Sequence, residues 1–155
     1  MKKKLDFITN SSSASFIAWG ISMSGEDLKK NYGKELFKIH KQKEEKEKHG
    51  KALKQGAFMV VPSEEDKDKL AVEYDEFLED DEFVWTCESI FEDVGLDVRQ
   101  MPYEDEVMIG KCPFSIKPDQ TLNEYKQEIC DKFKQCGVDM KPGELGQIEE
   151  CWMDN

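Results

Sequence analysis

The segment that decides how the fold begins is KLDFITNSSSASFIAWGI, residues Lys4–Ile21. Two apolar runs of β-prone residues flank a cluster of small hydroxyl residues, a pattern that predicts a β-hairpin at the very N-terminus. A secretory signal peptide would have a continuous apolar core at this place, and the polar break argues against one. The segment therefore favours a chain that starts with antiparallel strands.

Helical periodicity follows the hairpin. Ser24 can cap a helix whose apolar residues recur at helical spacing as far as Ile39. From Lys41 to Lys51 the apolar stripe disappears among lysines and glutamates, whose spacing supports a solvated helix. We expect residues 41–56 to form a charged helical arm or a linker.

Three further helices are predicted. Ser63 can cap the second helix, and a third with the same period begins near Phe83 and ends at Gly95. The clearest helix opens with a capping box formed by Thr121 and Glu124. One face of the second helix is expected to carry four apolar residues: Leu70, Tyr74, Phe77 and Leu78.

Four short apolar segments are predicted to be strands between and after these helices. They are Ala57–Val61, Leu96–Met101, Val107–Ile116 and Gln147–Met153. Strands and helices are interspersed, so the predicted class is α+β. We expect a mainly antiparallel sheet with an N-terminal hairpin and three to four helices packed on it, one of them extended by the charged arm.

The composition limits the architecture and the compartment. With 155 residues, of which 38% are apolar, the chain is long enough to form one domain, residues 1–155, around a real core. No apolar stretch approaches the roughly 20 residues that span a bilayer. We expect a cytoplasmic protein with no membrane contact.

The net charge of −12 is unevenly spread along the chain. Residues 1–58 have 13 lysines and 7 acidic residues, a balance of +6, which leaves −18 for residues 59–155. This division predicts an acidic surface that docks on a basic surface of a partner protein, although solvated helix faces would give the same counts. The residues expected to form that surface, with the tryptophan as its apolar anchor, are Glu76, Glu79, Asp80, Asp81, Glu82 and Trp85.

Two other kinds of ligand are not expected. Arg99 is the only arginine, and arginine is the residue best suited to bidentate contacts with phosphate and guanine, so direct nucleic-acid binding is not predicted. The acidic run lacks the spacing of a calcium-binding loop, and Phe77 and Leu78 interrupt it. The sequence thus predicts no metal and no cofactor.

The hydroxyl cluster is a second candidate site. Its side chains and backbone N–H groups could hold an anion, or one serine could act as a nucleophile if a base lay beside it. Only His40 and His49 could be a histidine base, and both belong to the charged part of the first helix. Alternatively, the loop hydroxyls satisfy their own backbone, as in ordinary turns. The residues of this possible ligand loop are Thr9, Asn10, Ser11, Ser12, Ser13 and Ser15.

The cysteines show no metal-binding or redox spacing. None of the five forms a Cys-x-x-Cys pair, and most fall on predicted core faces. Reduced thiols in a cytosolic protein are expected. The residues are Cys87, Cys112, Cys130, Cys136 and Cys151.

Two separated blocks resemble a group of small proteins from Gram-positive bacteria and their phages. Asp6–Ile17 resembles the group's N-terminal signature, an Asp-Phe-Val-Thr-Asn run followed by serines and Phe-Ile or Phe-Val, although Ala14 stands where serine is usual. The group's C-terminal half, which ends in a similar Glu-Glu-x-Trp-x-Asp sequence, resembles Ile109–Lys111, Ser115–Ile116, Asp119, Thr121, Tyr125–Lys126 and Glu149–Asp154. The resemblance implies an intracellular protein of bacterial or phage origin and no particular reaction, because no activity is established for the group.

Together these features favour a small acidic protein that acts as a non-enzymatic protein-binding module, such as an inhibitor or an accessory factor. Two alternatives remain open at the level of sequence. One is an enzyme or small-ligand binder that uses the Thr9–Ser15 loop, and the other is a structural component of an assembly.

Overall fold

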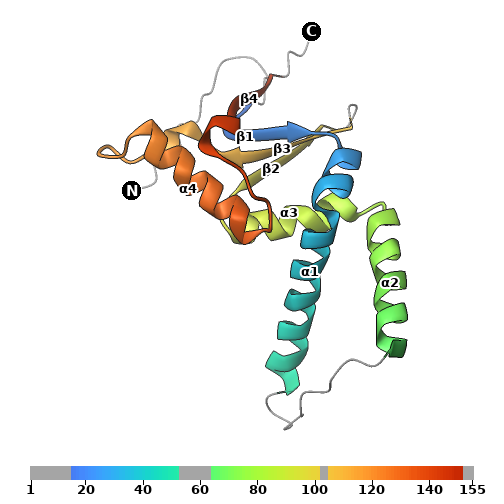
Figure 1. Cartoon of the computed structure of the whole chain (residues 1–155). Helices are drawn as coiled ribbons and strands as arrows, with labels where there is room; N and C mark the ends of the chain where they lie inside the picture. Colours follow the sequence, from blue (N-terminus) through green and yellow to red (C-terminus); the bar gives the residue numbers. More distant parts are fainter. Residues whose placement is uncertain (1–14, 53–63, 102–104, 152–155) are drawn as a thin grey trace.

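The computed structural model describes residues 15–52, 64–101 and 105–151. Within these ranges, a four-stranded antiparallel sheet is combined with four α-helices (Figure 1), so the predicted α+β class is confirmed. The strands are β1 (Ser15–Met23), β2 (Asp97–Met101), β3 (Glu106–Lys111) and β4 (Gly146–Cys151). The helices are α1 (Gly25–Ala52), α2 (Glu64–Glu79), α3 (Phe83–Asp93) and α4 (Leu122–Gln135), with short 3₁₀ turns at Pro113–Ser115 and Pro142–Glu144.

The strand order is β2-β3-β1-β4, which places β1 inside the sheet. Trp19 lies opposite Lys111 of β3 on one side and opposite Gln147 of β4 on the other. The second half of the predicted N-terminal hairpin is thus a strand, while its first half lies outside the described residues. Both described neighbours of β1 come from the C-terminal third of the chain, so the pairing of β1 in the sheet depends on residues that are distant in sequence.

The core lies under one face of the sheet, where α3, α4 and the first turns of α1 pack (Figure 1). Aromatic and branched side chains fill it, and the rings of Phe91 and Phe133 meet edge to face with centroids 6.1 Å apart. The largest fully buried side chains include Leu28, Leu36, Phe83, Phe91, Ile109, Tyr125, Ile129 and Phe133.

Helix α1 begins as its sequence predicts, and its second half extends away from the sheet (Figure 1). The hydroxyl of Ser24 accepts a hydrogen bond from the backbone N–H of Asp27 at 3.0 Å, which satisfies one donor of the first turn. The charged stretch predicted as an arm or linker is helical through Ala52, and residues 45–50 are exposed. Among the described helices, none is both long enough and apolar enough to cross a bilayer.

Helix α2 joins the core by packing against the helices α1 and α3. Its buried Phe77 packs between the rings of Phe37 and Phe83, at centroid distances of 5.4 and 5.2 Å. Leu70, predicted on the same apolar face, is 48% exposed, whereas Tyr74 and Phe77, further along α2, pack against Phe37 of α1. The apolar face of α2 is therefore only partly covered.

The helix-terminal signals near the C-terminus are confirmed. In the capping box, the N–H of Thr121 donates to the Glu124 carboxylate at 2.8 Å, and the N–H of Glu124 donates to the Thr121 hydroxyl at 3.2 Å. Gly137 follows α4 with φ +76° and Gly95 follows α3 with φ +84°, values that glycine adopts without the steric strain of a Cβ.

Two predicted strands differ from the structure or lie outside it. The strand predicted for Val107–Ile116 ends at Lys111, because Pro113 has no N–H for a sheet and opens a 3₁₀ turn, in which Ser115 N donates to the Cys112 carbonyl at 3.1 Å. The predicted strand 57–61 lies outside the described residues.

Candidate functional site

The predicted acidic surface lies where α2 ends and α3 begins (Figure 1). All of its carboxylates are exposed, and Trp85, in the first turn of α3, is 69% exposed. Within the described part of the chain, none of these carboxylates forms an ion pair with a lysine or arginine. We call this surface the acidic turn patch, formed by Glu76, Glu79, Asp80, Asp81, Glu82 and Trp85.

Backbone hydrogen bonds fix the turn that presents the patch. The carboxylate of Asp80 accepts from the N–H of Glu82 at 2.9 Å, and the Asp80 carbonyl accepts from Phe83 N at 3.0 Å. The carbonyl of Glu82 then accepts from Thr86 N at 2.9 Å, which starts α3. Asp80 thus has a structural role in the turn, whereas the other carboxylates of the patch point to solvent.

Buried aromatic residues on both sides of the turn explain why Trp85 faces outward. Phe77 at the end of α2 packs against Phe83 at the start of α3, and this contact holds the two helices together. Each residue advances about 100° around a helix, so Trp85, two positions after Phe83, lies about 200° away from the buried face. The tryptophan therefore stands on a rigid helix among unpaired negative charges.

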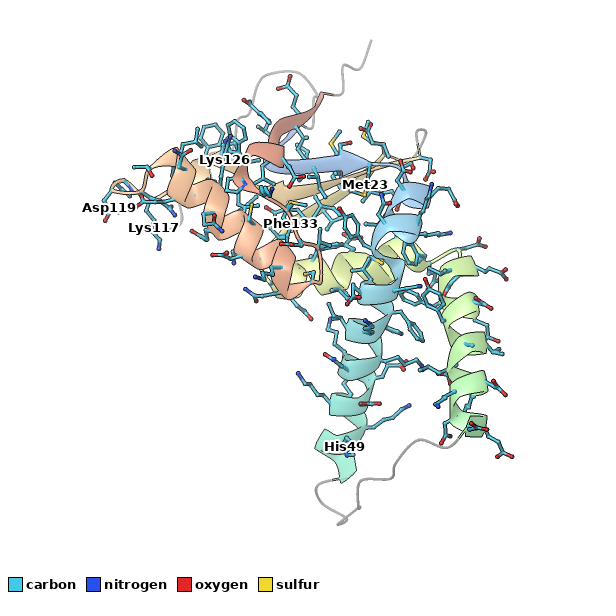
Figure 2. All side chains as sticks on the ribbon, in the orientation of Figure 1. Met23, His49, Lys117, Asp119, Lys126 and Phe133 are labelled. Carbon is cyan, nitrogen blue, oxygen red and sulfur yellow. The ribbon has the colours of Figure 1, made fainter. Side chains whose placement is uncertain are left out.

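Most of the hydroxyl loop predicted as a ligand site lies outside the described residues. Its residues 9–13 lie outside the described residues, and of Ser15 only the backbone is placed, opposite Cys151 in the sheet. Of the two histidines, His40 stacks on Phe77 at a centroid distance of 5.3 Å, with its Nε2 3.5 Å from Glu44 Oε1. His49 lies exposed near the far end of α1 (Figure 2).

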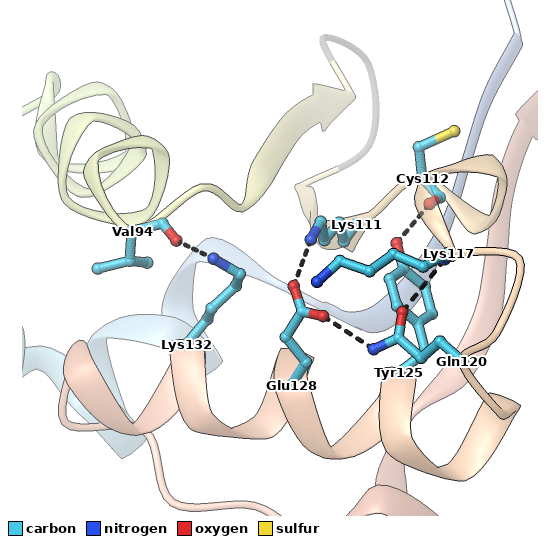
Figure 3. A network of polar contacts seen from close by, with 8 residues as sticks. All are labelled: Val94, Lys111, Cys112, Lys117, Gln120, Tyr125, Glu128 and Lys132. Carbon is cyan, nitrogen blue, oxygen red and sulfur yellow. Dashed lines mark hydrogen bonds and ion pairs between the residues drawn. The ribbon is translucent and has the colours of Figure 1, made fainter.

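A polar network between β3 and α4 was not predicted from the sequence (Figure 3). Lys111 Nζ donates to Glu128 Oε1 at 2.6 Å, and Gln120 Nε2 donates to Glu128 Oε2 at 3.0 Å. The hydroxyl of the buried Tyr125 donates to the Cys112 carbonyl at 2.5 Å. No local pattern reveals these partners, because they meet only once α4 lies on the sheet.

The network resembles an acid–base site in its composition, but every group in it has a partner. Burial raises the pKa of Tyr125 to about 12, which keeps its hydroxyl protonated and donating. The hydrogen bond from Lys111, followed by that from Gln120, lowers the pKa of Glu128 to about 2. Together with Lys132, whose Nζ donates to the Val94 carbonyl at 2.7 Å, these groups fix α4 against the sheet and α3.

The Glu128 carboxylate should make part of the stability depend on pH. Its pKa is lower in the folded chain than its ordinary value of 4.5, so its contribution is complete above about pH 4.5 and disappears as the pH falls toward 2. Because the site is partly exposed, we expect Glu128→Gln to lower the free energy of unfolding by only about 1 kcal/mol at neutral pH. Urea unfolding at a series of pH values would show the two proteins converging on acidification.

The exposed variant Glu47→Gln, outside the network, provides the control for that titration and should match the wild type throughout. A difference between wild type and Glu128→Gln that stays constant down to pH 3 would contradict a carboxylate held ionised by Lys111.

The cysteines of the described chain have no partner among themselves. Cys87, Cys112, Cys130 and Cys136 are free thiols, and all but Cys112 are buried. Burial raises the pKa of Cys87 to about 12, so that thiol stays protonated and unreactive. Among the described residues, no group of three or more His, Cys, Asp or Glu side chains is arranged to hold a metal ion.

Comparison of the chain with models of protein families, with curated proteins and with solved structures gave no match.

Proposed function

We propose that this chain is a non-enzymatic protein-binding module that engages a basic surface of a partner protein through the acidic turn patch. The observation that carries the proposal is the placement of a largely exposed tryptophan among carboxylates that have no ion-pair partner in the described chain. Tryptophan is enriched among residues that dominate binding energy, and surrounding charges guide association.

The order of the turn supports a pre-formed surface. The Asp80 hydrogen bond and the Phe77–Phe83 contact hold the end of α2 and the start of α3 in one geometry. A partner therefore has little ordering of the patch to do on binding, which favours affinity. Acidic surfaces of this kind fit the phosphate-binding face of a nucleic-acid enzyme, so an inhibitor or accessory factor is the role proposed.

The compartment is proposed with the same function. Free thiols at all four described cysteines favour a reducing environment, and the N-terminal resemblance favours a bacterial or phage origin. The proposed setting is the bacterial cytoplasm.

The test is a pull-down of the tagged full chain from bacterial lysate at low and moderate salt, followed by association kinetics with the recovered partner. A variant with four reversed charges, which keeps Asp80 because it holds the turn, should lose the partner and slow association by about tenfold or more. Its substitutions are Glu76→Lys, Glu79→Lys, Asp81→Lys and Glu82→Lys. Trp85→Ala should accelerate dissociation instead.

A control variant undergoes the same change in net charge at scattered exposed positions and should keep the partner. Its substitutions are Glu47→Lys, Glu92→Lys, Asp119→Lys and Asp139→Lys. Equal binding by the patch variant and the wild type would refute the proposal.

A further inference from the structure

Helices α1 and α2 extend side by side from the sheet (Figure 1). A groove of about 520 Å³ lies between them. Its floor is apolar and consists mainly of Phe37 from α1 together with Leu70 and Tyr74 from α2. The rings of Phe37 and Tyr74 meet edge to face with their centroids 5.3 Å apart, and this contact joins the two sides of the groove. Leu70, 48% exposed, lies beyond this contact and is left without cover by the described chain.

Helical spacing explains how the groove forms. The lining residues of α2 recur at positions 67, 70, 71 and 74, and those of α1 at 34, 37, 38, 41, 42 and 45, so each set occupies one face of its helix. Lys41 crosses to Glu73 of α2 at 2.9 Å and ties the two helices together. The apolar face of α2 therefore faces α1, but α1 covers only part of it.

The rim of the groove is positively charged, in contrast to the protein as a whole. Four lysines and one glutamate line it, while the whole chain has a net charge of −12. Lys38 pairs with Glu35, and Lys41 pairs with Glu44 and Glu73. Within the described part of the chain, Lys34 and Lys67, one on each helix, form no ion pair.

We propose that this groove is a second docking site, which accepts an acidic amphipathic helix of a partner protein. The apolar face of that helix would cover Phe37, Leu70 and Tyr74, and its carboxylates would meet Lys34 and Lys67 on the rim. Amphipathic helices are commonly bound in this way, with apolar anchors in the groove and charges at its edges. The site goes beyond the acidic turn patch, because it selects the opposite charge.

The test uses two fluorescein-labelled synthetic peptides of about 15 residues, long enough to form a helix when bound. Both have leucines at every third and fourth position, with glutamates elsewhere in one peptide and lysines in the other. Fluorescence anisotropy with the full chain should show about tenfold tighter binding of the glutamate peptide. The double variant Lys34→Glu/Lys67→Glu should reverse this preference, and Leu70→Asp should weaken binding of both peptides.

Matched controls separate the groove from general charge and from folding. Lys46→Glu/Lys134→Glu changes the net charge equally at exposed positions outside the groove and should keep the wild-type preference. Val72→Asp alters a residue that is 57% exposed on another face of α2, and it should bind like the wild type. Trp85→Ala, which removes the anchor of the acidic turn patch without changing any charge, should also bind the glutamate peptide like the wild type, so the two proposals can fail separately.

Three results would overturn the proposal. The first is the absence of binding or of preference between the peptides, and the second is an unchanged preference in the double lysine variant. The third is self-association of the wild type in sedimentation that Leu70→Asp abolishes, because the groove would then be occupied by a second copy of this chain.

Discussion

Replacing Phe133 with alanine should lower the free energy of unfolding by about 3–5 kcal/mol, the range for deleting a buried aromatic ring. Phe133 is 0% exposed in the last full turn of α4, and its ring packs edge to face against Phe91 of α3. The substitution would remove an aromatic contact between these two helices beneath the sheet. The surrounding side chains come from different elements and cannot all move into the space, so a cavity would remain.

Urea unfolding followed by circular dichroism measures this loss. The matched control is Phe114→Ala, the same chemical change at a position that is 57% exposed, and we expect it to cost about 1 kcal/mol or less. Equal losses for the two variants would show that α4 is not packed against α3 as described.

Features that depend on neighbours in sequence could be predicted. The capping box at Thr121 and Glu124 and the Ser24 cap each need only residues three positions apart, and both form as expected. The helical periods that begin near Phe83 and Thr121 also fix which faces are buried, because the buried residues of α3 and α4 follow them. The α+β class follows from the order of these elements.

Features that depend on distant partners could not be predicted. The neighbours of β1 in the sheet, β3 and β4, lie far along the chain, and nothing in the residues of β1 specifies them. Pro113 indicates a break, but β3 ends at Lys111, short of the predicted Ile116, and the Tyr125 hydroxyl that donates to the Cys112 carbonyl there comes from α4. The Lys111–Glu128 pair is likewise a product of tertiary packing.

The two candidate docking surfaces differ in the same way. The acidic turn patch could be predicted from the sequence, since its charged residues lie close together in the chain and the helical period places Trp85 away from the buried face of its helix. The groove could not, because the periodicity of α2 places Leu70 on an apolar face and does not reveal that α1 leaves that face partly open. The groove lies between α1 and α2 and the acidic turn patch between α2 and α3, so both surfaces lie outside the sheet and α4, which act as their support.

That support depends on an unusually close approach between β1 and β3, and we expect Gly20→Ala to lower the free energy of unfolding by about 2–3 kcal/mol. Gly20 lies opposite Gly110, and a Cβ on Gly20 would overlap the Ile109 carbonyl oxygen and lie 2.6 Å from the Gly110 Cα. These are backbone atoms, so no side-chain rotation can relieve the overlap, and the two strands would have to separate.

The control for Gly20→Ala is Gly146→Ala, in the strand β4 on the opposite side of β1 from β3. Gly146 of β4 also pairs with Gly20, but a Cβ added at Gly146 would meet no atom within 4 Å. Gly146→Ala should therefore change the free energy of unfolding by less than about 1 kcal/mol, because the added methyl group meets no neighbouring atom and restricts only the unfolded chain. If urea unfolding shows both substitutions to be equally mild, β1 and β3 are not in close contact. If Gly20→Ala alone is severe, the glycine pair is what allows β1 to lie close against β3 at the centre of the sheet.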